Sequence, residues 1–437
     1  MPKYLDTSDR TFSSDFRALL DAKREESRDV DDAVAAIIED VRLRGDDALI
    51  ELTAKFDRLS LTPETLAVSE GEIDQACAGV DPKERAALEV AARRIRAYHQ
   101  RQRPEDASWT DESGAMLGWR WRPIEAAGLY VPGGLASYPS SVLMNAIPAE
   151  VAGVKRLAIA APTPDGITNP LVLLAARLSG VKTVYRFGGA QAIAALAYGT
   201  ASVAKVDKIT GPGNAYVAAA KRRVFGKVGI DMVAGPSEIL VVADRNNNPD
   251  WIALDLLSQA EHDDSAQSIL ITDDKTFGAA VANAVDLRLQ SLKRRAIAGA
   301  SWRDFGAIIN VRTLDEAVEL TDRIAPEHLE ICVSDAEAFA DRVSHAGAIF
   351  LGAWTPEAIG DYVGGPNHVL PTARSARFSS GLSVMDFVKR TTIARMTPTA
   401  LRAIGPAAET LAGSEGLEAH GLSVRARLDS LNEGAAD

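Results

Sequence analysis

Apolar residues near the start of the chain recur at helical spacing. The repeating positions are Val30, Val34, Ile37, Ile38 and Val41. Asp29 precedes them as a candidate N-cap, and Asp81 opens a later segment with proline in its first turn and glutamate at its third helical position. Because apolar residues three and four apart share one helical face, the pattern predicts a helical N-terminal part over residues 1–127.

From about residue 128 the pattern changes to short apolar runs that alternate with alanine-rich helical runs. The apolar runs cover residues 156–161, 183–187, 206–210, 238–243, 268–272, 307–311 and 348–351. Strands that alternate with helices of this length predict an α/β fold with parallel sheets. The runs fall into two blocks and then give way to helical, charged sequence. This predicts two α/β domains, 128–236 and 237–380, and a small helical C-terminal domain, 381–437.

Length and charge exclude several classes of protein. The chain has 437 residues, enough for about three domains at roughly 150 residues each, and a formal net charge of −12. A protein this acidic is a poor candidate for binding nucleic acid or anionic membranes through bulk electrostatics. No apolar stretch reaches the roughly 18 residues that a membrane span needs, and the N-terminus lacks the apolar core of a signal peptide. We therefore expect a cytoplasmic protein without nucleic-acid or membrane partners.

Few side chains are available as ligands for a transition metal. The two cysteines form no metal-type pair, so a metal site must use histidines, carboxylates and amides. The six histidines are His99, His262, His328, His345, His368 and His420. Their surroundings in the sequence favour structural roles for His99, His345 and His368.

Three glycine-rich turns follow predicted strands, at residues 128–134, 187–191 and 210–216. Glycines at a strand-to-helix turn let a ligand approach the backbone, and the N-terminus of the following helix favours a phosphate. The third turn begins like a dinucleotide-binding fingerprint, but Tyr216 stands where the third glycine belongs. Each turn alone is typical of ordinary α/β proteins, whereas three in one domain favour a ligand the size of a nucleotide.

Two short segments combine residues that suit metal binding or acid–base chemistry. Gln259 and His262 are three apart, so on a helix they lie on one face and can share a ligand; a capped helix end is the alternative. Glu327 and His328 follow a proline that ends a predicted helix. They are either a base and water-activating pair or part of a surface loop.

Two further segments are ambiguous by spacing alone. A glycine-rich loop at residues 360–368 carries Asp361 and His368, and loops of this composition often hold ligands. Glu415 and His420 are five apart, so a straight helix would not aim them at one point, although a bend near Gly416 would. Spacing cannot join these segments to one another.

Together, these segments resemble the histidinol dehydrogenase family, zinc-dependent enzymes that complete histidine biosynthesis. The matching motifs are Gly-Leu-Tyr-Val-Pro-Gly-Gly, Gly-Gly-Ala-Gln-Ala, Gly-Pro-Gly-Asn, Ala-Gly-Pro-Ser-Glu, Gln-Ala-Glu-His, Ala-Pro-Glu-His-Leu-Glu, Pro-Asn-His-Val-Leu-Pro and Glu-Gly-Leu-Glu-Ala-His. They occur in order from about Gly128 to His420. The resemblance covers most of the chain and is very specific.

The resemblance implies a role for particular residues. It implies one Zn²⁺ per subunit, held by Gln259, His262, Asp361 and His420, and Glu327 and His328 as the catalytic acid–base pair. It implies contacts with the substrate from Ser237 and Glu415, as well as from the four metal ligands and His328. It implies contacts with NAD⁺ from Tyr130, Gln191 and Asn214.

The resemblance also implies a fold and a reaction. The fold is two incomplete Rossmann-like domains, 128–236 binding NAD⁺ and 237–380 carrying zinc and the catalytic residues. A homodimer with swapped C-terminal parts would bring His420 and Glu415 to the partner's active site. The reaction is the oxidation of L-histidinol through L-histidinaldehyde to L-histidine. Alternatives are a related zinc and NAD⁺ alcohol dehydrogenase acting on another small polar alcohol such as a sulfonated diol, a zinc hydrolase, and a non-catalytic ligand-binding protein.

Overall fold

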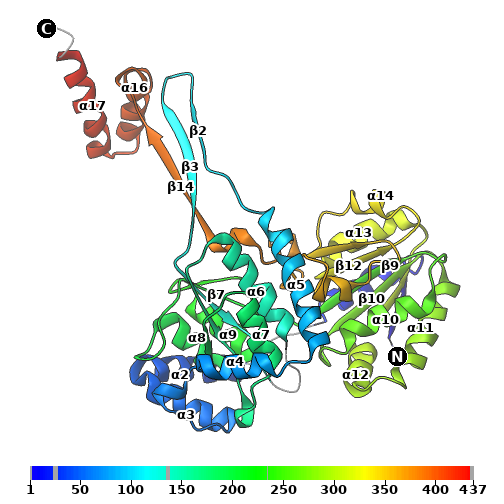
Figure 1. Cartoon of the computed structure of the whole chain (residues 1–437). Coiled ribbons are helices and arrows are strands. Elements are labelled where there is room, and N and C mark those ends of the chain that lie inside the picture. The colour runs from blue at the N-terminus through cyan, green and yellow to red at the C-terminus, as the bar shows by residue number, and fades with distance from the viewer. Residues whose placement is uncertain (1, 23–27, 134–137, 234, 434–437) are drawn as a thin grey trace. The chain divides into compact units, whose positions relative to one another are not determined.

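The computed structural model describes residues 2–22, 28–133, 138–233 and 235–433. Contacts divide the chain into two compact units. The first consists of Met1–Gln102 and Glu125–Phe387, and the second of Arg103–Ile124 and Val388–Asp437. The first unit contains two parallel sheets flanked by helices, which confirms the predicted α/β class (Figure 1). In the part of the chain that is described, no helix is long and apolar enough to cross a membrane.

The first sheet has five parallel strands in the order β6-β5-β4-β7-β8. They are β4 (Ala126–Tyr130), β5 (Arg156–Ala160), β6 (Thr183–Tyr185), β7 (Lys208–Thr210) and β8 (Gly229–Ile230). Its helices are α6 (Pro139–Ala152), α7 (Pro170–Leu178), α8 (Gly189–Tyr198) and α9 (Ala215–Val224). Strand β4 is buried along its whole length, as expected for a strand in a sheet covered on both faces. Strand order reverses between β4 and β7, which makes this gap the switch point where α/β proteins bind ligands.

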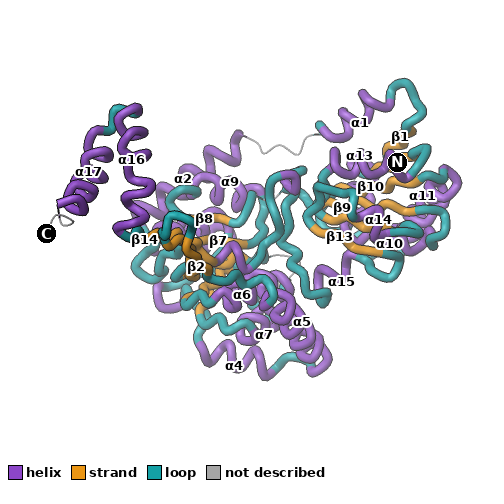
Figure 2. Tube along the Cα trace, turned by 90° about the horizontal axis from the view of Figure 1, so that it is seen from above, coloured by secondary structure: helices purple, strands orange, loops and turns teal. Residues whose placement is uncertain are grey.

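The second sheet has six parallel strands in the order β1-β11-β10-β9-β12-β13. They are β1 (Lys3–Asp6), β9 (Glu238–Ala243), β10 (Gln267–Thr272), β11 (Ala307–Asn310), β12 (His328–Cys332) and β13 (Ala348–Leu351). One apolar cluster joins the sheet to α1 (Phe12–Leu20), α13 (Leu314–Ile324) and α14 (Ala336–Ala340). Another joins its opposite face to α10 (Pro249–Ala260), α11 (Lys275–Leu289) and α12 (Arg295–Phe305). Figure 2 shows these strands enclosed between helices.

The N-terminal part is mainly helical but contains strands in two places. Its other helices are α2 (Arg28–Arg44), α3 (Asp46–Asp57), α4 (Glu70–Ala78) and α5 (Pro82–Gln100). Strand β1 is the first difference, and it pairs in parallel with β11 at the edge of the second sheet. The second difference is a hairpin formed by β2 (Ala107–Thr110) and β3 (Met116–Pro123). Strand β1 escapes prediction because a short edge strand is specified by its partner strand and not by its own periodicity.

The second unit is a three-stranded antiparallel sheet with two helices. Strand β14 (Val388–Arg395) pairs with β3 along eight residues, and β3 pairs with β2. Helices α16 (Pro398–Ser414) and α17 (Glu418–Glu433) complete the unit. They pack closely at Gly405, where a Cβ would lie 3.2 Å from the side chains of Leu428 and Val424. The C-terminal part thus contains two helices and, in addition to the expected helical sequence, strand β14.

Candidate functional site

The glycine-rich turns of the first sheet meet at the carboxyl ends of its strands. Tyr130 ends β4, and its hydroxyl accepts a hydrogen bond from the backbone N–H of Gly189 at 3.1 Å. Gly211 follows β7 with a φ of +114°, and a Cβ there would collide with the carbonyl oxygen of Tyr130. The second and third turns therefore converge on Tyr130, at the switch point of the sheet.

The first turn packs against the second through a shared proline. A Cβ at Gly133 or at Gly188 would lie 2.6 Å from atoms of Pro162, so both positions require glycine. Gly134, which belongs to the predicted first turn, lies outside the described residues, as do residues 135–137. The described parts of all three turns thus lie together at the carboxyl ends of the strands of the first sheet.

The three residues expected to contact NAD⁺ lie in this region. Tyr130 is buried, and burial raises its pKa to about 12. Gln191 is buried in the first turn of α8. Asn214 is the N-cap of α9 and accepts hydrogen bonds from the backbone N–H groups of Tyr216 and Val217, at 3.1 and 3.2 Å. The structure brings these positions to one end of the first sheet.

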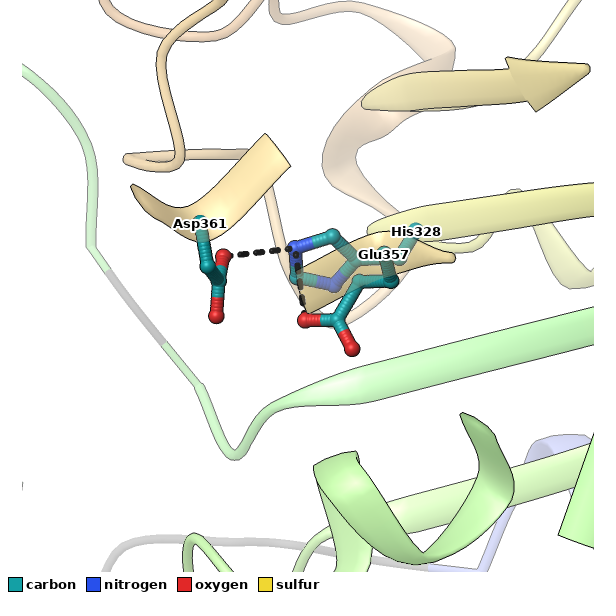
Figure 3. Close-up of side chains that lie close together, drawn as sticks. All are labelled: His328, Glu357 and Asp361. Atoms are coloured by element: carbon teal, nitrogen blue, oxygen red, sulfur yellow. Dashed lines mark ion pairs between the residues drawn. The ribbon is translucent and has the colours of Figure 1, made fainter. Parts of the chain in front are cut away.

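A second cluster consists of His328, Glu357 and Asp361 (Figure 3). His328 begins β12, whereas Glu357 and Asp361 are four apart on α15 (Glu357–Tyr362) and therefore share one face of that helix. His328 Nε2 lies 3.7 Å from Glu357 Oε1 and 3.9 Å from Asp361 Oδ1. One ligand atom from each residue lies within 4.8 Å of the others, close enough to hold a metal ion.

The buried imidazole of His328 is oriented by its other ring nitrogen. Nδ1 lies 3.0 Å from the carbonyl oxygen of Glu238, so it carries the proton and donates to that oxygen. Nε2 is buried without a hydrogen-bond partner among the described residues, and its lone pair faces two carboxyl groups. Burial lowers the pKa of His328 and raises that of Glu357 to about 7 and that of Asp361 to about 6. This arrangement suits an added positive charge, because a cation would satisfy all three groups.

A sharp change in chain direction after α13 places Glu327 immediately before β12, next to His328. Helix α13 ends at Ile324, its C-cap Ala325 has a φ of +47°, and Pro326 prevents the helix from continuing. Glu327 is buried, and its Oε2 accepts a hydrogen bond from the backbone N–H of Glu238 at 2.9 Å. Burial raises the pKa of its carboxyl well above the usual value. A carboxyl with a raised pKa next to an imidazole is suited to proton transfer near neutral pH.

Three of the four expected zinc ligands lie in this cluster or near it. Asp361 belongs to it. Gln259, buried at the end of α10, donates through its amide to Glu357 Oε1 at 3.1 Å and accepts from the N–H of Glu238 at 3.3 Å. His262 follows α10, is exposed, and lies close enough to His328 for their charges to interact.

The other expected site residues have different surroundings. Ser237 immediately precedes β9 and is partly exposed. Glu415 is the C-cap that follows α16, and His420 lies on α17; both are exposed and belong to the second unit. His368, expected to be structural, places Nδ1 3.0 Å from the carbonyl oxygen and 3.7 Å from the carboxylate of Asp361. His368 therefore borders the cluster directly.

Sequence reasoning missed Glu357 and the two acids behind it. The N–H of Glu357 donates to Glu330 Oε1 at 2.6 Å, and Glu330 is hydrogen-bonded to Asp255 of α10. Burial raises the pKa of Glu330 well above the usual value and that of Asp255 to about 6. Two patterns pointed to them: the spacing of four between Glu357 and Asp361, and the strand period of two that places Glu330 on the same face as His328.

Replacing Glu357 by glutamine should change how the stability of the metal-free protein depends on pH. The folded state holds a proton on Glu357 up to a pKa of about 7, whereas the unfolded chain releases it near 4.5. The wild type therefore loses stability as the pH rises from 4.5 to about 7, by about 3 kcal/mol from this group, and Glu357→Gln does not. Urea unfolding at a series of pH values measures the difference. Exposed Glu319 provides the control variant, Glu319→Gln, and parallel pH curves for wild type and Glu357→Gln would contradict the expectation.

Comparison with known proteins gives a consistent result. Residues 20–428 match the family model described as Histidinol dehydrogenase. Among similar proteins are the histidinol dehydrogenase of Ruegeria pomeroyi, 76% identical over 99% of this chain and 100% of the relative, and that of Cereibacter sphaeroides, 74% identical over 99% and 100%. The crystal structure of the histidinol dehydrogenase from Elizabethkingia anophelis superposes with a TM-score of 0.94 at 38% identity and covers 99% of both chains. The chain therefore belongs to the histidinol dehydrogenase family of oxidoreductases.

Proposed function

We propose that this protein catalyses the NAD⁺-dependent, four-electron oxidation of L-histidinol through L-histidinaldehyde to L-histidine, the last step of histidine biosynthesis. The observation that carries the proposal is the buried imidazole of His328. Its Nε2 faces two carboxyl groups, and its Nδ1 lies 3.7 Å from the carboxylate of buried Glu327. Such a pair supplies both a base for a hydroxyl proton and a base for water. Similarity to enzymes named histidinol dehydrogenase supports the choice of substrate.

The residues present fit one Zn²⁺ per subunit. The proposed ligands are Gln259, His262 and Asp361, with His420 from the partner subunit of a homodimer. Two imidazoles, a carboxylate and an amide are suitable ligands for zinc. The unpartnered nitrogen of His328 and the raised pKa of Asp361 also indicate a site that lacks a positive charge. When bound, zinc would supply a Lewis acid that orients the amine and imidazole nitrogens of the substrate.

His328 and Glu327 have separate tasks in the proposed reaction. NAD⁺, held at Tyr130, Gln191 and Asn214, supplies the hydride acceptor in both oxidations. His328 accepts the proton of the substrate hydroxyl at Nε2, while its Nδ1–H stays bound to the carbonyl of Glu238. Glu327 then removes a proton from the water that adds to the aldehyde, and His328 acts as base again in the second oxidation.

The remaining roles concern the substrate and the assembly. We propose that Ser237 and Glu415 bind the substrate, together with His328 and the zinc ligands, and that Glu415 also comes from the partner subunit. The ranges 128–236 and 237–380 stay our proposed NAD⁺-binding and catalytic domains. A cytoplasmic location also remains a prediction.

The function is tested by mixing the purified, zinc-loaded protein with NAD⁺ and histidinol and following NADH absorbance. Two NADH should form for each histidinol consumed, with histidine as the product. A sulfonated diol serves as the comparison substrate, because a related dehydrogenase with another specificity would oxidise it instead. Absence of NADH with histidinol would overturn the proposal.

Removing zinc with a chelator should abolish the binding of histidinol as well as its oxidation. The reason is that the metal orients the substrate, whereas NAD⁺ binds at the glycine-rich turns of the other sheet. Calorimetry on the metal-free protein should therefore show no histidinol binding and unchanged NAD⁺ binding, and histidinol binding and oxidation should return when zinc is restored. Normal histidinol binding to metal-free protein with loss of turnover alone would contradict the orienting role.

A further inference from the structure

A buried ion pair lies next to the third glycine-rich turn. Lys221 is on α9 and Asp231 follows β8, and their side chains are 2% and 1% exposed. Burying two charges costs several kcal/mol per ion unless further hydrogen bonds satisfy them. The catalytic tasks proposed above use neither residue.

Both members of the pair bind the backbone of one residue, Gly211. Lys221 Nζ donates to the carbonyl oxygen of Gly211 at 3.0 Å. Asp231 Oδ2 accepts from the N–H of Gly211 at 2.8 Å. The ion pair therefore fixes the orientation of the peptide groups on both sides of Gly211.

Gly211 is a position where such fixing matters. Its φ of +114° is a conformation that only glycine adopts easily, and it lies against the carbonyl of Tyr130 at the switch point. Glycine is also the residue with the most freedom to leave this conformation. The turn continues through Gly213, where a Cβ would collide with Val217, to the N-cap Asn214. A shift at Gly211 would thus move Asn214 and the start of α9.

The chain also departs from the standard dinucleotide fingerprint at this turn. Tyr216 occupies the position of the third glycine, whose usual role is close packing of helix and strand. Here the helix is tied to the turn by Lys221, which reaches back from the middle of α9 to Gly211. In the standard motif, close backbone packing connects the helix to the turn. In this chain, the charged side chain of Lys221 makes that connection.

We propose that Lys221 and Asp231 are positioning residues for NAD⁺, because their ion pair holds the Gly211 peptide in the conformation that presents the turn to the dinucleotide. This inference rests on the proposed function, which places NAD⁺ at Asn214. The ion pair should therefore affect the binding of NAD⁺ and not the binding of histidinol at the second sheet.

Kinetics of Lys221→Met test the proposal. The variant removes the hydrogen bond to the Gly211 carbonyl and leaves Asp231 buried without its counter-charge. The KM for NAD⁺ should rise about tenfold or more, since small displacements of binding groups have effects of this size. The KM for histidinol, and kcat at saturating NAD⁺, should stay within about twofold of the wild type.

A second variant distinguishes a positioning role of the ion pair from a general effect on the stability of the fold. Lys221→Met/Asp231→Asn removes both charges but keeps an oxygen that can accept from the N–H of Gly211. It should recover part of the NAD⁺ affinity lost in Lys221→Met, as well as part of its thermal stability. The matched control is Arg223→Met, because Arg223 on the same helix forms an exposed ion pair with Asp31, and its KM values should not change.

The outcomes distinguish this proposal from the proposed function. Calorimetry with NAD⁺ alone is done first on the wild type, and absence of binding there would overturn the proposed function and this inference together. If the wild type binds NAD⁺ and Lys221→Met binds it equally well, only the positioning role is wrong. An equal loss of affinity for NAD⁺ and histidinol would also overturn it, since the pair would then act on the fold as a whole.

Discussion

Replacing Glu327 by glutamine is expected to leave the first oxidation of histidinol largely intact and to slow the second by about 10²–10⁴-fold. Only the second oxidation requires water, and Glu327 is the proposed base for that water. Glutamine keeps the volume and a carbonyl oxygen that can accept from the N–H of Glu238, the bond that holds Glu327 in place. The variant therefore removes a basic group without removing its main contact.

A single-turnover measurement shows the difference between the two steps. With enzyme in excess over histidinol, Glu327→Gln should form one NADH rapidly and the second slowly, and supplied histidinaldehyde should be oxidised slowly. His328→Asn should slow both steps, because His328 is the proposed base in each. Unchanged aldehyde oxidation by Glu327→Gln would contradict the assignment, and Glu319→Gln, at an exposed position on α13, controls for the substitution itself.

Mixing two inactive variants should restore activity if the site is shared between subunits. His420→Asn lacks a ligand proposed to come from the partner, and Asp361→Ala lacks a ligand of the subunit that holds the site. A mixed dimer contains one site in which both residues are native and one in which both are replaced. Random exchange of subunits should therefore restore about a quarter of wild-type activity from two nearly inactive proteins.

The measurement requires that subunits exchange. The two variants are mixed after mild dissociation and reassociation, and NADH formation is followed against the same treatment of each variant alone. A mixture of Asp361→Ala with Gln259→Ala is the matched control, because both replacements fall in the same subunit's site and no intact site can form. Absence of restoration for His420→Asn with Asp361→Ala would show that each site is built from one chain.

The α/β class could be predicted from the sequence because most strands and helices have a pattern within their own residues. Buried parallel strands such as β9 and β10 are mainly apolar runs, and the helix between them has an N-cap asparagine followed by proline. Strand β1 could not be predicted in this way. Its four residues have no distinguishing pattern, and they form a strand only because β11 offers a free edge.

The candidate site could be predicted only in part, for a similar reason. Glu327 and His328 are adjacent in the sequence, so their pairing was visible. Glu357 is separated from His328 by 28 intervening residues, and it reaches the imidazole because α15 begins on the buried carboxyl of Glu330. A buried acid that supports another acid has no sequence signature beyond spacing. Resemblance to a family supplied residues such as His420, for which spacing gave almost no signal.

The pairing of β1 with β11 has a consequence for synthesis of the chain. Lys3 to Asp6 leave the ribosome about 300 residues before their partners, Ala307 to Asn310. At the usual translation rate of 5–20 residues per second, the segment Lys3–Asp6 remains unpaired for about 15–60 s. During this time the first sheet can fold, because all five of its strands precede residue 231. Strand β1 is thus made before the first sheet but pairs after that sheet can fold, and an N-terminal fusion that delays its docking should slow maturation of the second sheet more than that of the first.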